Sequence, residues 1–373
     1  MSFPCPAARV TATVDTHALT RNFGLLRALA HQNNPSARVI AVVKANAYGH
    51  GLSLSVPAFA RAGCRHFAVA TLQEALAVRA LSPRADILIL GYTPPESAGV
   101  LAEKRLTQTV FSTGYARLLS PAAKAGKTVR IHLKWDGGMV RLGFRDRDAL
   151  LRAAELPFLS PAGLFTHFPR GEDPALCRPA LRELCAVGKA LSERGHRPLL
   201  HAAASAALLS FPESTLAAVR PGLALYGLSP VRTELPLSPA LSLSTFLSDL
   251  HRVPAGSALA VDREGFSAWI TERPSFIGTC PAGYADGFPR ALSGFSVTVC
   301  SGGKTFRAPV VGRVCMDQLM LDLTGIPAAP YDRVVLWDNA QAPADFAGTI
   351  PYEILTALSD RVVRERKKDD PLL

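Results

Sequence analysis

The chain has 373 residues, a formal net charge of +11 and seven cysteines. This length exceeds the usual size of one hydrophobic core, so we expect a large domain and a second domain. The odd cysteine count, without a CxxC pair, argues against a disulfide framework and gives no reason to expect a metal. The lysines and arginines are scattered, whereas a nucleic-acid-binding surface needs clustered positive charge.

Residues 1–14 lack a charged segment followed by a long apolar one, and no run of about 18 apolar residues occurs later. We therefore expect a cytoplasmic protein with reduced thiols and with no membrane or nucleic-acid partner. The densest basic run is Arg361–Lys368, which stands before Asp369 and Asp370. We interpret this run as a solvated tail.

Short apolar runs alternate with helical patterns through the first two-thirds of the chain. Thr71 and Glu74, three residues apart, predict a capping box at the start of one helix. This alternation indicates βαβ units, and their number favours a (β/α)₈ barrel over an open parallel sheet. The expected strands are Val10–Val14, which could pair with either domain, Arg38–Lys44, residues 68–70, Asp86–Leu90, Val129–Lys134, Ala162–Thr166 and Leu199–His201.

Beyond about residue 235 the helical periodicity fades, and β-rich runs lie between glycine and proline turns. These runs predict a mostly antiparallel β-domain with one helix near Tyr352–Leu358. We therefore place the boundary between the barrel and the β-domain at residue 235, and the pattern leaves open which domain the N-terminal strand joins. The expected β-domain strands are Ser275–Thr279, Phe295–Val299, Thr305–Val311, Gln318–Leu323 and Arg333–Trp337.

The segment Ala41–Gly51 reads AVVKANAYGHG, so Lys44 ends a buried strand. Catalytic residues of barrel enzymes collect at the carboxyl ends of the strands. An amine that emerges from an apolar wall can have a lowered pKa and form a Schiff base. The small residues around Lys44 allow a ligand to approach the backbone, and Tyr48 can offer its hydroxyl to an anion.

AVVKANAYGHG resembles the cofactor-lysine motif of alanine racemases, which are fold-type III pyridoxal-phosphate enzymes. Further motifs follow in the order and at the spacing of that family and extend over nearly the whole chain. They are VATLQEAL, HLKWDGGMVRLGF, THF, HAAAS, VRPGLALYGLSP, PAGYADGFPR, VVGRVCMDQLMLDL and GTIPYEIL. The resemblance implies a (β/α)₈ barrel followed by a β-domain, with the first strand of the chain in the β-domain. On this basis the barrel comprises residues 12–235, and the β-domain comprises residues 1–11 and 236–373.

The resemblance also implies how the cofactor is held. Lys44 is expected to carry the pyridoxal Schiff base and Arg220 to face the pyridine nitrogen. A guanidinium does not give up its proton, so the ring nitrogen stays unprotonated and the cofactor is a weaker electron sink. The expected phosphate ligands are the Tyr48 and Ser205 hydroxyls, the backbone N–H groups of Gly222 and Leu223, and Tyr352, which also narrows the pocket.

Racemisation requires that a proton leave one face of Cα and arrive on the other. The resemblance implies that Tyr284 acts opposite Lys44. A phenol ordinarily titrates near about 10, so it needs help to act as a base near neutrality. His167 is expected next to Tyr284, with Arg220 behind it and His201 supporting Arg220.

Substrate recognition is expected from Arg141, which would bind the carboxylate, and from the backbone of Met316 of a partner chain. Asp317 would orient nearby donors. Lys134 matches a lysine that is carbamylated in many relatives and so holds the arginine in place. The resemblance therefore implies a homodimer with shared active sites that interconverts L- and D-alanine and supplies D-alanine for peptidoglycan.

The sequence departs from the family pattern at several positions. Ala204 stands where many relatives have Asn, and Gly137 and Val140 replace the commoner Thr and Gly. The stretch Ser257–Ser275 lacks a usual Tyr-Gly pair and is a few residues longer. These changes concern substrate breadth and rate more than the type of reaction.

Three other functions are alternatives to alanine racemisation. A serine or broad-specificity racemase is the main alternative, against which Tyr352 argues because serine-favouring relatives often have a smaller residue there. A fold-type III decarboxylase would use a cysteine such as Cys315, but Arg220 and Tyr284 argue against it. The third is a non-catalytic pyridoxal-phosphate carrier. Such proteins usually lack the second domain, so the second domain of this chain, with Tyr284 and Met316, argues against it.

Overall fold

The computed structural model describes residues 8–123, 128–261 and 267–368. It divides into two compact units. One unit comprises residues 17–47 and 52–238, and the other comprises residues 1–16, 48–51 and 239–373. The sequence places this boundary at residue 235 and assigns residues 12–16 to the barrel. Residues 1–7 lie outside the described residues, and so does this part of the expectation that residues 1–14 form no signal peptide.

The first unit is a closed parallel barrel in which each strand pairs with the next and β2 pairs with β9. This arrangement confirms the predicted (β/α)₈ class over an open sheet. The strands are β2 (Arg38–Val42), β3 (His66–Val69), β4 (Asp86–Ile89), β5 (Leu106–Val110), β6 (Val129–Lys134), β7 (Leu159–Phe165), β8 (Leu199–Ala204) and β9 (Ala218–Arg220). Most residues of these strands are buried, as strands covered on both faces require, but β5 and β6 also bury polar residues such as Gln108 and His132.

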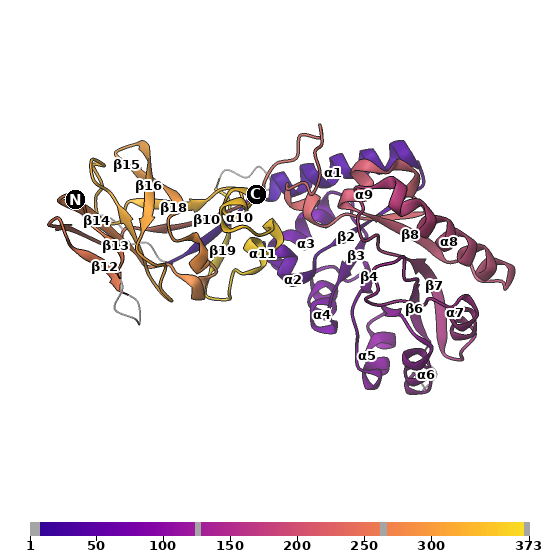
Figure 1. Ribbon diagram of the computed structural model, residues 1–373. Coiled ribbons are helices and arrows are strands. Elements are labelled where there is room, and N and C mark those ends of the chain that lie inside the picture. The colour runs from indigo at the N-terminus through magenta and orange to yellow at the C-terminus, as the bar shows by residue number, and fades with distance from the viewer. Residues whose placement is uncertain (1–7, 124–127, 262–266, 369–373) are drawn as a thin grey trace. The chain divides into compact units, whose positions relative to one another are not determined.

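Helices lie outside the ring of strands (Figure 1). The predicted capping box begins α4, because Thr71 accepts from the Glu74 N–H and Glu74 accepts from the Thr71 N–H. Among the described residues, no helix is long and apolar enough to cross a membrane. The helices are α1 (Thr16–Asn33), α2 (Lys44–Tyr48), α3 (Leu52–Arg61), α4 (Leu72–Leu81), α5 (Ala98–Glu103), α6 (Thr113–Ala122), α7 (Arg147–Ala154), α8 (Pro174–Glu193) and α9 (Ser205–Ser210).

The second unit contains a nine-stranded sheet in the order β11-β14-β17-β16-β15-β18-β10-β1-β19. Its neighbouring strands are antiparallel except β1 and β19, so the predicted mostly antiparallel domain is confirmed. Short helices α10 (Gln341–Ala347) and α11 (Pro351–Thr356) follow the last antiparallel strand. The strands are β1 (Thr11–Val14), β10 (Leu241–Phe246), β11 (Asp249–Val253), β14 (Ser275–Cys280), β15 (Ser296–Ser301), β16 (Lys304–Val311), β17 (Leu319–Asp322), β18 (Arg333–Trp337) and β19 (Val363–Arg366).

The C-terminal basic run is folded, so its interpretation as a solvated tail is wrong. Residues 363–366 form β19, which pairs in parallel with β1 from the other end of the chain. Lys367 donates to the Asp15 carboxylate at 3.0 Å. Charge density alone misleads here, because backbone pairing and distant acidic partners order the run.

The divergent segment between residues 257 and 275 forms a hairpin of β12 (Ala258–Val261) and β13 (Ser267–Ile270). Residues 262–266 lie outside the described residues. Leu259 is buried with Ile277 and Val311, and Trp269 packs against this small cluster. Part of the inserted length therefore extends the apolar packing of the β-domain.

Candidate active site

Lys44 stands at the carboxyl end of β2, where the strand passes into α2. The next four residues, from Ala45 to Tyr48, have φ of 52, 51, 56 and 51°, so the chain makes a left-handed turn. Non-glycine residues adopt this conformation at a cost of roughly 1–2 kcal/mol each, and such strain concentrates at functional sites. The Glu74 carboxylate holds the start of the turn, because it accepts from the Ala45 and Ala70 N–H groups at 2.6 and 2.8 Å.

Five of the predicted residues form a basic cluster at this end of the barrel: Lys44, Lys134, Arg141, His167 and Arg220. Lys44 is exposed in the single chain. Partial loss of its hydration, followed by the charge of Arg141, nevertheless lowers its pKa. Burial, and then Arg141 and Arg220, lower the pKa of Lys134 to about 8. Burial and the same arginines lower the pKa of His167 to about 3, so its imidazole is neutral near pH 7. The cluster is suited to an anionic ligand.

Arg220 ends β9 and is buried, with 3% of its surface exposed. Its guanidinium donates to the Thr166 and Ala202 carbonyls at 2.7 and 3.0 Å and to His201 Nδ1 at 2.6 Å. Burial lowers the pKa of Arg220 to about 9, which still leaves it charged near neutrality. Because three hydrogen bonds fix the guanidinium, it can present a positive charge that does not move with the ligand.

The hydrogen-bond chain continues to a residue that the sequence does not predict, His132 on β6. An arginine can only donate, so His201 Nδ1 must accept and its Nε2 must carry the proton. That Nε2 lies 2.9 Å from His132 Nδ1. Gly163 makes room for the second ring, because a Cβ there would lie 2.5 Å from His132 Nε2. Strand alternation was the available signal, since His132 and Lys134 are two residues apart and share a face of β6.

Ser205, Gly222 and Leu223 lie together at the ends of β8 and β9. The Ser205 hydroxyl oxygen accepts from the backbone N–H groups of Gly222 and Ala224 at 2.9 and 3.3 Å. Its own proton is therefore available for an acceptor such as a phosphate oxygen. In this chain the Gly222 N–H, which was expected to face a phosphate, points to Ser205.

The loop that carries Arg141 is organised by Asp136. The Asp136 carboxylate accepts from the Gly138 and Val140 N–H groups at 3.2 and 3.1 Å and pairs with Arg145 at 2.7 Å. Val140 has a φ of 52° and is 69% exposed. A β-branched residue is rare in this region, where glycine is unstrained, so the departure at Val140 is a strained one.

The other departures remove polar atoms near the cluster. Gly137 packs so closely that a Cβ there would lie 2.5 Å from Thr166 Oγ1. That hydroxyl is buried and has no hydrogen-bond partner within the described part of the chain. Ala204 begins α9 without a side-chain cap, which an asparagine can supply.

In the β-domain, Tyr284 lies on a turn that rests on the segment carrying Met316. The Tyr284 N–H donates to the Cys315 carbonyl at 3.0 Å, and the Ala285 N–H donates to the Met316 carbonyl at 3.0 Å. Gly283 permits this approach, because a Cβ there would lie 2.4 Å from the Met316 carbonyl oxygen. The Tyr284 and Met316 side chains are 42% and 53% exposed in the single chain. Two predicted site residues are thus brought together and left accessible.

Tyr48 and Tyr352 meet in the same unit, with ring centroids 6.0 Å apart. Burial, and then the neighbouring Tyr352, raise the pKa of Tyr48, and burial also raises the pKa of Tyr352. Both phenols therefore keep their protons near neutrality and can donate to an anion. Gly49 is required beside them, because a Cβ at this position would lie 2.0 Å from the Leu355 carbonyl oxygen.

These residues fit a phosphorylated aldehyde cofactor. The amine of Lys44 stands at a strand end within a basic cluster, and the Ser205 hydroxyl proton is available nearby. Arg220 supplies a fixed donor that suits an unprotonated ring nitrogen better than a carboxylate would. The fold and the site together define a two-domain enzyme built on a (β/α)₈ barrel, with a lysine at the carboxyl end of a barrel strand.

Comparison with known proteins specifies the family. The model of the alanine racemase N-terminal domain matches residues 14–230, and that of the C-terminal domain matches residues 240–366. The chain belongs to the alanine racemase family and is an isomerase. Members of this family use pyridoxal phosphate.

Curated relatives and solved structures agree over nearly the full length. Alanine racemases of Desulfovibrio desulfuricans and Clostridium perfringens are 38% and 37% identical, over 95% and 98% of this chain and 97% of each relative. The alanine racemase of Bacillus anthracis, solved with bound L-Ala-P, matches with a TM-score of 0.88 and 33% identity over 98% of this chain and 97% of that one. The biosynthetic alanine racemase of Pseudomonas aeruginosa matches with a TM-score of 0.81 and 34% identity, over 96% and 99% of the two chains.

Proposed function

We propose that this protein interconverts L- and D-alanine with Lys44 and Tyr284 as proton-transfer groups on opposite faces of Cα. The observation that carries the proposal is the position of Lys44, at the end of a barrel strand with a lowered pKa, in one basic cluster with Arg220. An amine with a lowered pKa is a better nucleophile near neutrality and a better acceptor of the Cα proton.

We propose that pyridoxal phosphate is the cofactor and that residues of the barrel unit hold its ring. When bound, this group supplies a carbonyl for covalent attachment and withdraws electrons from Cα. Lys44 would form the covalent link, and Arg220 would donate to the ring nitrogen. The phosphate would be bound by the Tyr48, Ser205 and Tyr352 hydroxyls and by the backbone N–H of Leu223, while the Gly222 N–H holds the Ser205 hydroxyl in place.

Arg141 would bind the substrate carboxylate, together with the Met316 backbone of the partner. Since the pKa of Lys134 is lowered to about 8, part of its amine is neutral near pH 7. A neutral amine is the form that reacts with carbon dioxide, so Lys134 is suited to become a carbamate that holds Arg141. The single-chain exposure of Arg141 and its loop leaves this arginine accessible to a ligand.

Proton transfer would then divide between the two faces. Lys44 would take or return the proton on the D-alanine face, and Tyr284 would do so on the L-alanine face. His167 is neutral near pH 7 and can therefore hydrogen-bond to the Tyr284 hydroxyl without adding a further positive charge to the cluster. Arg220, held by His201, would support His167, and Asp317 would orient donors near Met316.

We also propose a homodimer in which the β-domain of one chain completes the site of the other. The exposure of Tyr284 and Met316, at 42% and 53%, supports this arrangement, because both side chains remain available to a second chain. We infer a cytoplasmic enzyme that supplies D-alanine for peptidoglycan. Tyr352 would narrow the pocket and favour alanine over larger substrates.

A chirally resolved product assay tests the proposal. Purified protein with pyridoxal phosphate is incubated with L-Ala, D-Ala, L-Ser or D-Ser, and each enantiomer is quantified. We expect alanine to racemise in both directions and serine to react far more slowly. Borohydride treatment should attach the pyridoxyl group to Lys44, as read by peptide mass spectrometry. Preferred turnover of serine would refute alanine as the substrate. Attachment of the pyridoxyl group to another lysine would refute the role of Lys44.

A further inference from the structure

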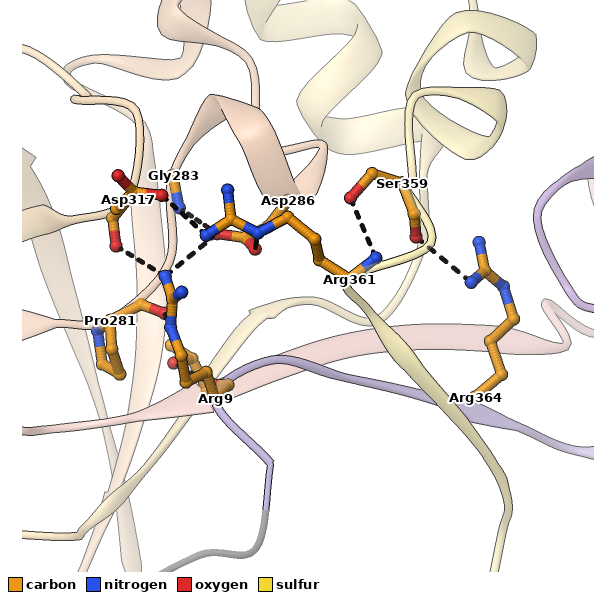
Figure 2. Close-up of polar contacts among 9 residues, drawn as sticks. Arg9, Pro281, Gly283, Asp286, Asp317, Ser359, Arg361 and Arg364 are labelled. Atoms are coloured by element: carbon orange, nitrogen blue, oxygen red, sulfur yellow. Dashed lines mark hydrogen bonds and ion pairs between the residues drawn. The ribbon is translucent and has the colours of Figure 1, made fainter.

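The folded C-terminal run holds an arginine whose contacts lead to the Tyr284 turn. Arg361 donates to the Asp317 carboxylate at 2.6 Å, and its Nε lies 3.4 Å from the Asp286 carboxylate. Figure 2 shows the Arg361 guanidinium beside both carboxylates. Asp317 directly follows Met316, and Asp286 lies two residues after Tyr284. One side chain therefore links the two segments that carry the predicted β-domain site residues.

Asp286 is the buried member of this cluster, with a side chain only 3% exposed. Its carboxylate accepts from the Gly283 N–H at 3.0 Å, which closes the turn around Tyr284. A buried carboxylate needs compensating charge as well as hydrogen bonds. Arg361 and Arg9 supply that charge, at 3.4 and 3.6 Å.

Arg9 reinforces the same segments from the N-terminal side. It donates to the backbone carbonyls of Asp317 and Pro281 at 3.1 and 3.3 Å, on either side of the turn (Figure 2). Four stretches of chain, around residues 9, 283, 317 and 361, thus meet at two carboxylates. The backbone bonds between the Tyr284 turn and the 315–316 segment lie within this meeting point.

We propose that Arg361 is a positioning residue for Tyr284 and that it acts through Asp286 and Asp317. By pairing with both carboxylates, it keeps the Tyr284 turn seated on the backbone of Cys315 and Met316. The inference rests on the proposed role of Tyr284 in proton transfer. It assigns Arg361 no contact with substrate or cofactor.

Loss of Arg361 should change the local position of the Tyr284 turn rather than the stability of the whole domain. Arg361 and Arg9 are 42% and 46% exposed, and exposed ion pairs contribute little to overall stability. Loss of Arg361 should therefore leave the β-domain folded, since Arg9 still pairs with Asp286. A displacement of about 1 Å at a reacting group can nevertheless reduce a rate about 100-fold.

Arg364, three residues further on, has a different target and serves as a contrast. It donates to the Gly49 carbonyl at 2.7 Å and to the carbonyls of Leu358, Ser359 and Val362. It therefore holds the segment that carries Tyr48 rather than the Tyr284 turn. The two arginines of one basic run support different predicted site residues.

The test measures solvent deuterium incorporation at Cα of each alanine enantiomer in the holoenzyme. For Arg361→Gln we expect incorporation into L-alanine to fall roughly 10- to 100-fold, while incorporation into D-alanine stays within about twofold. Arg361→Lys should recover part of the loss because it keeps the charge. Arg307→Gln is the matched control, since Arg307 is an exposed β-domain arginine whose bonds within the described residues go to Ser296 and Thr298. It should change neither rate.

The cofactor-free protein gives a second readout. Amide deuterium exchange at Tyr284 and Ala285 should accelerate in Arg361→Gln, because their bonds to Cys315 and Met316 open more often, while barrel amides stay unchanged. Asp317→Asn provides a second variant that removes the negative charge of one partner of Arg361 and leaves Asp286 paired. It should reproduce the L-alanine defect in weaker form.

The double variant with Tyr284→Phe separates the inference from the proposed function. If Arg361 acts only through Tyr284, adding Arg361→Gln to Tyr284→Phe should cause no further loss. Equal slowing of both enantiomers, an unchanged L-alanine rate, or an additive loss in the double variant would overturn the inference alone. If Tyr284→Phe leaves deuterium incorporation into L-alanine unchanged, the proposed role of Tyr284 in proton transfer is refuted instead.

Discussion

The barrel and the β-domain hold their predicted site residues in different ways. In the barrel, Arg220 and His201 are 3% and 0% exposed and are fixed by short hydrogen bonds at strand ends. In the β-domain, Tyr284 and Met316 project from turns, are 42% and 53% exposed, and depend on backbone contacts and an ion-pair cluster.

This difference predicts which substitutions should slow both directions of the reaction and which should slow only one. A preorganised, buried network sets the charge around the reacting centre, so its loss should affect both directions of the reaction. A turn that presents one side chain should affect only the step which that side chain performs. Exposed apolar groups next to ordered backbone are also what a surface that completes another chain's site requires.

The largest expected effect comes from mixing two inactive variants. Lys44→Ala and Tyr284→Phe homodimers should each have almost no racemase activity. If the β-domain acts on the partner's barrel, a mixed dimer contains one site with both defects and one intact site. The isolated mixed dimer should then have roughly half of the wild-type activity per dimer, whereas an unseparated random mixture would have roughly a quarter.

The measurement is racemisation after the two variants are coexpressed with different tags and the mixed dimer is isolated. Each variant coexpressed with itself is the control. Absence of recovery in a mixed dimer that binds the cofactor would mean that both residues serve a site within one chain.

A smaller effect is expected at His132, which sharpens the account of the barrel. His132→Phe removes the acceptor for the His201 N–H, so the tautomer that accepts from Arg220 is no longer favoured. A hydrogen bond in a charged network contributes roughly 1.5–3 kcal/mol, so kcat should fall about tenfold or more in both directions. His132→Asn keeps an acceptor and should recover part of the rate.

The direct readout for His132 is the ring ¹⁵N chemical shifts of His201, which distinguish the two tautomers in the cofactor-free protein. A loss confined to one enantiomer, or unchanged His201 shifts in His132→Phe, would contradict the proposed relay.

The buried histidines also predict a pH dependence of barrel stability. Burial lowers the pKa of His132 to about 3, and burial and Arg220 lower the pKa of His167 to about 3, from an ordinary value of 6.5. The unfolded chain therefore binds more protons than the folded chain between pH 6.5 and 3. Stability is full above pH 6.5 and declines as the pH falls through this window, by up to about 1.4 kcal/mol per pH unit for each histidine.

Urea unfolding at pH 7, 6 and 5, followed by pulse labelling of barrel peptides, measures this dependence. His132→Asn should show a shallower slope because it lacks one of the titrating groups. An equal slope in the variant and the wild type would exclude His132 as a contributor.

The smallest expected effect is a gain of stability at Val140. Its φ of 52° costs a β-branched residue roughly 1–2 kcal/mol. A glycine relieves this strain but adds about 0.4–1 kcal/mol of unfolded-state entropy. Val140→Gly should therefore stabilise the barrel by roughly 0.5–1 kcal/mol, with the backbone bond to Asp136 kept. Thermal unfolding measures the change, and a lower midpoint would show that the turn is not strained.

Much of the barrel could be predicted because its signals are local. Apolar runs mark β4 and β6 within a residue of their observed ends, and Thr71 and Glu74 mark the start of α4. Lys44 was found as a strand-end lysine because strand and motif coincide. The left-handed turn at residues 45–48 contains no glycine, so its composition does not predict the positive φ angles.

The β-domain clusters depend on partners that are distant in sequence, which no local pattern reveals. Arg361 pairs with Asp317 across 44 residues, and Arg9 bonds to the same residue across 308. The basic run was therefore mistaken for a tail. His132 was missed for a related reason, since its partner His201 lies 69 residues away on another strand.

The most direct test of the two-face account is deuterium incorporation by Tyr284→Phe. This change removes only the hydroxyl, so we expect the ring to keep its place and the cofactor to bind. We expect racemisation and incorporation into L-alanine to fall roughly 10²–10⁴-fold, while D-alanine still exchanges through Lys44. Similar exchange of both enantiomers would contradict the account, because Lys44 or another group would then serve both faces.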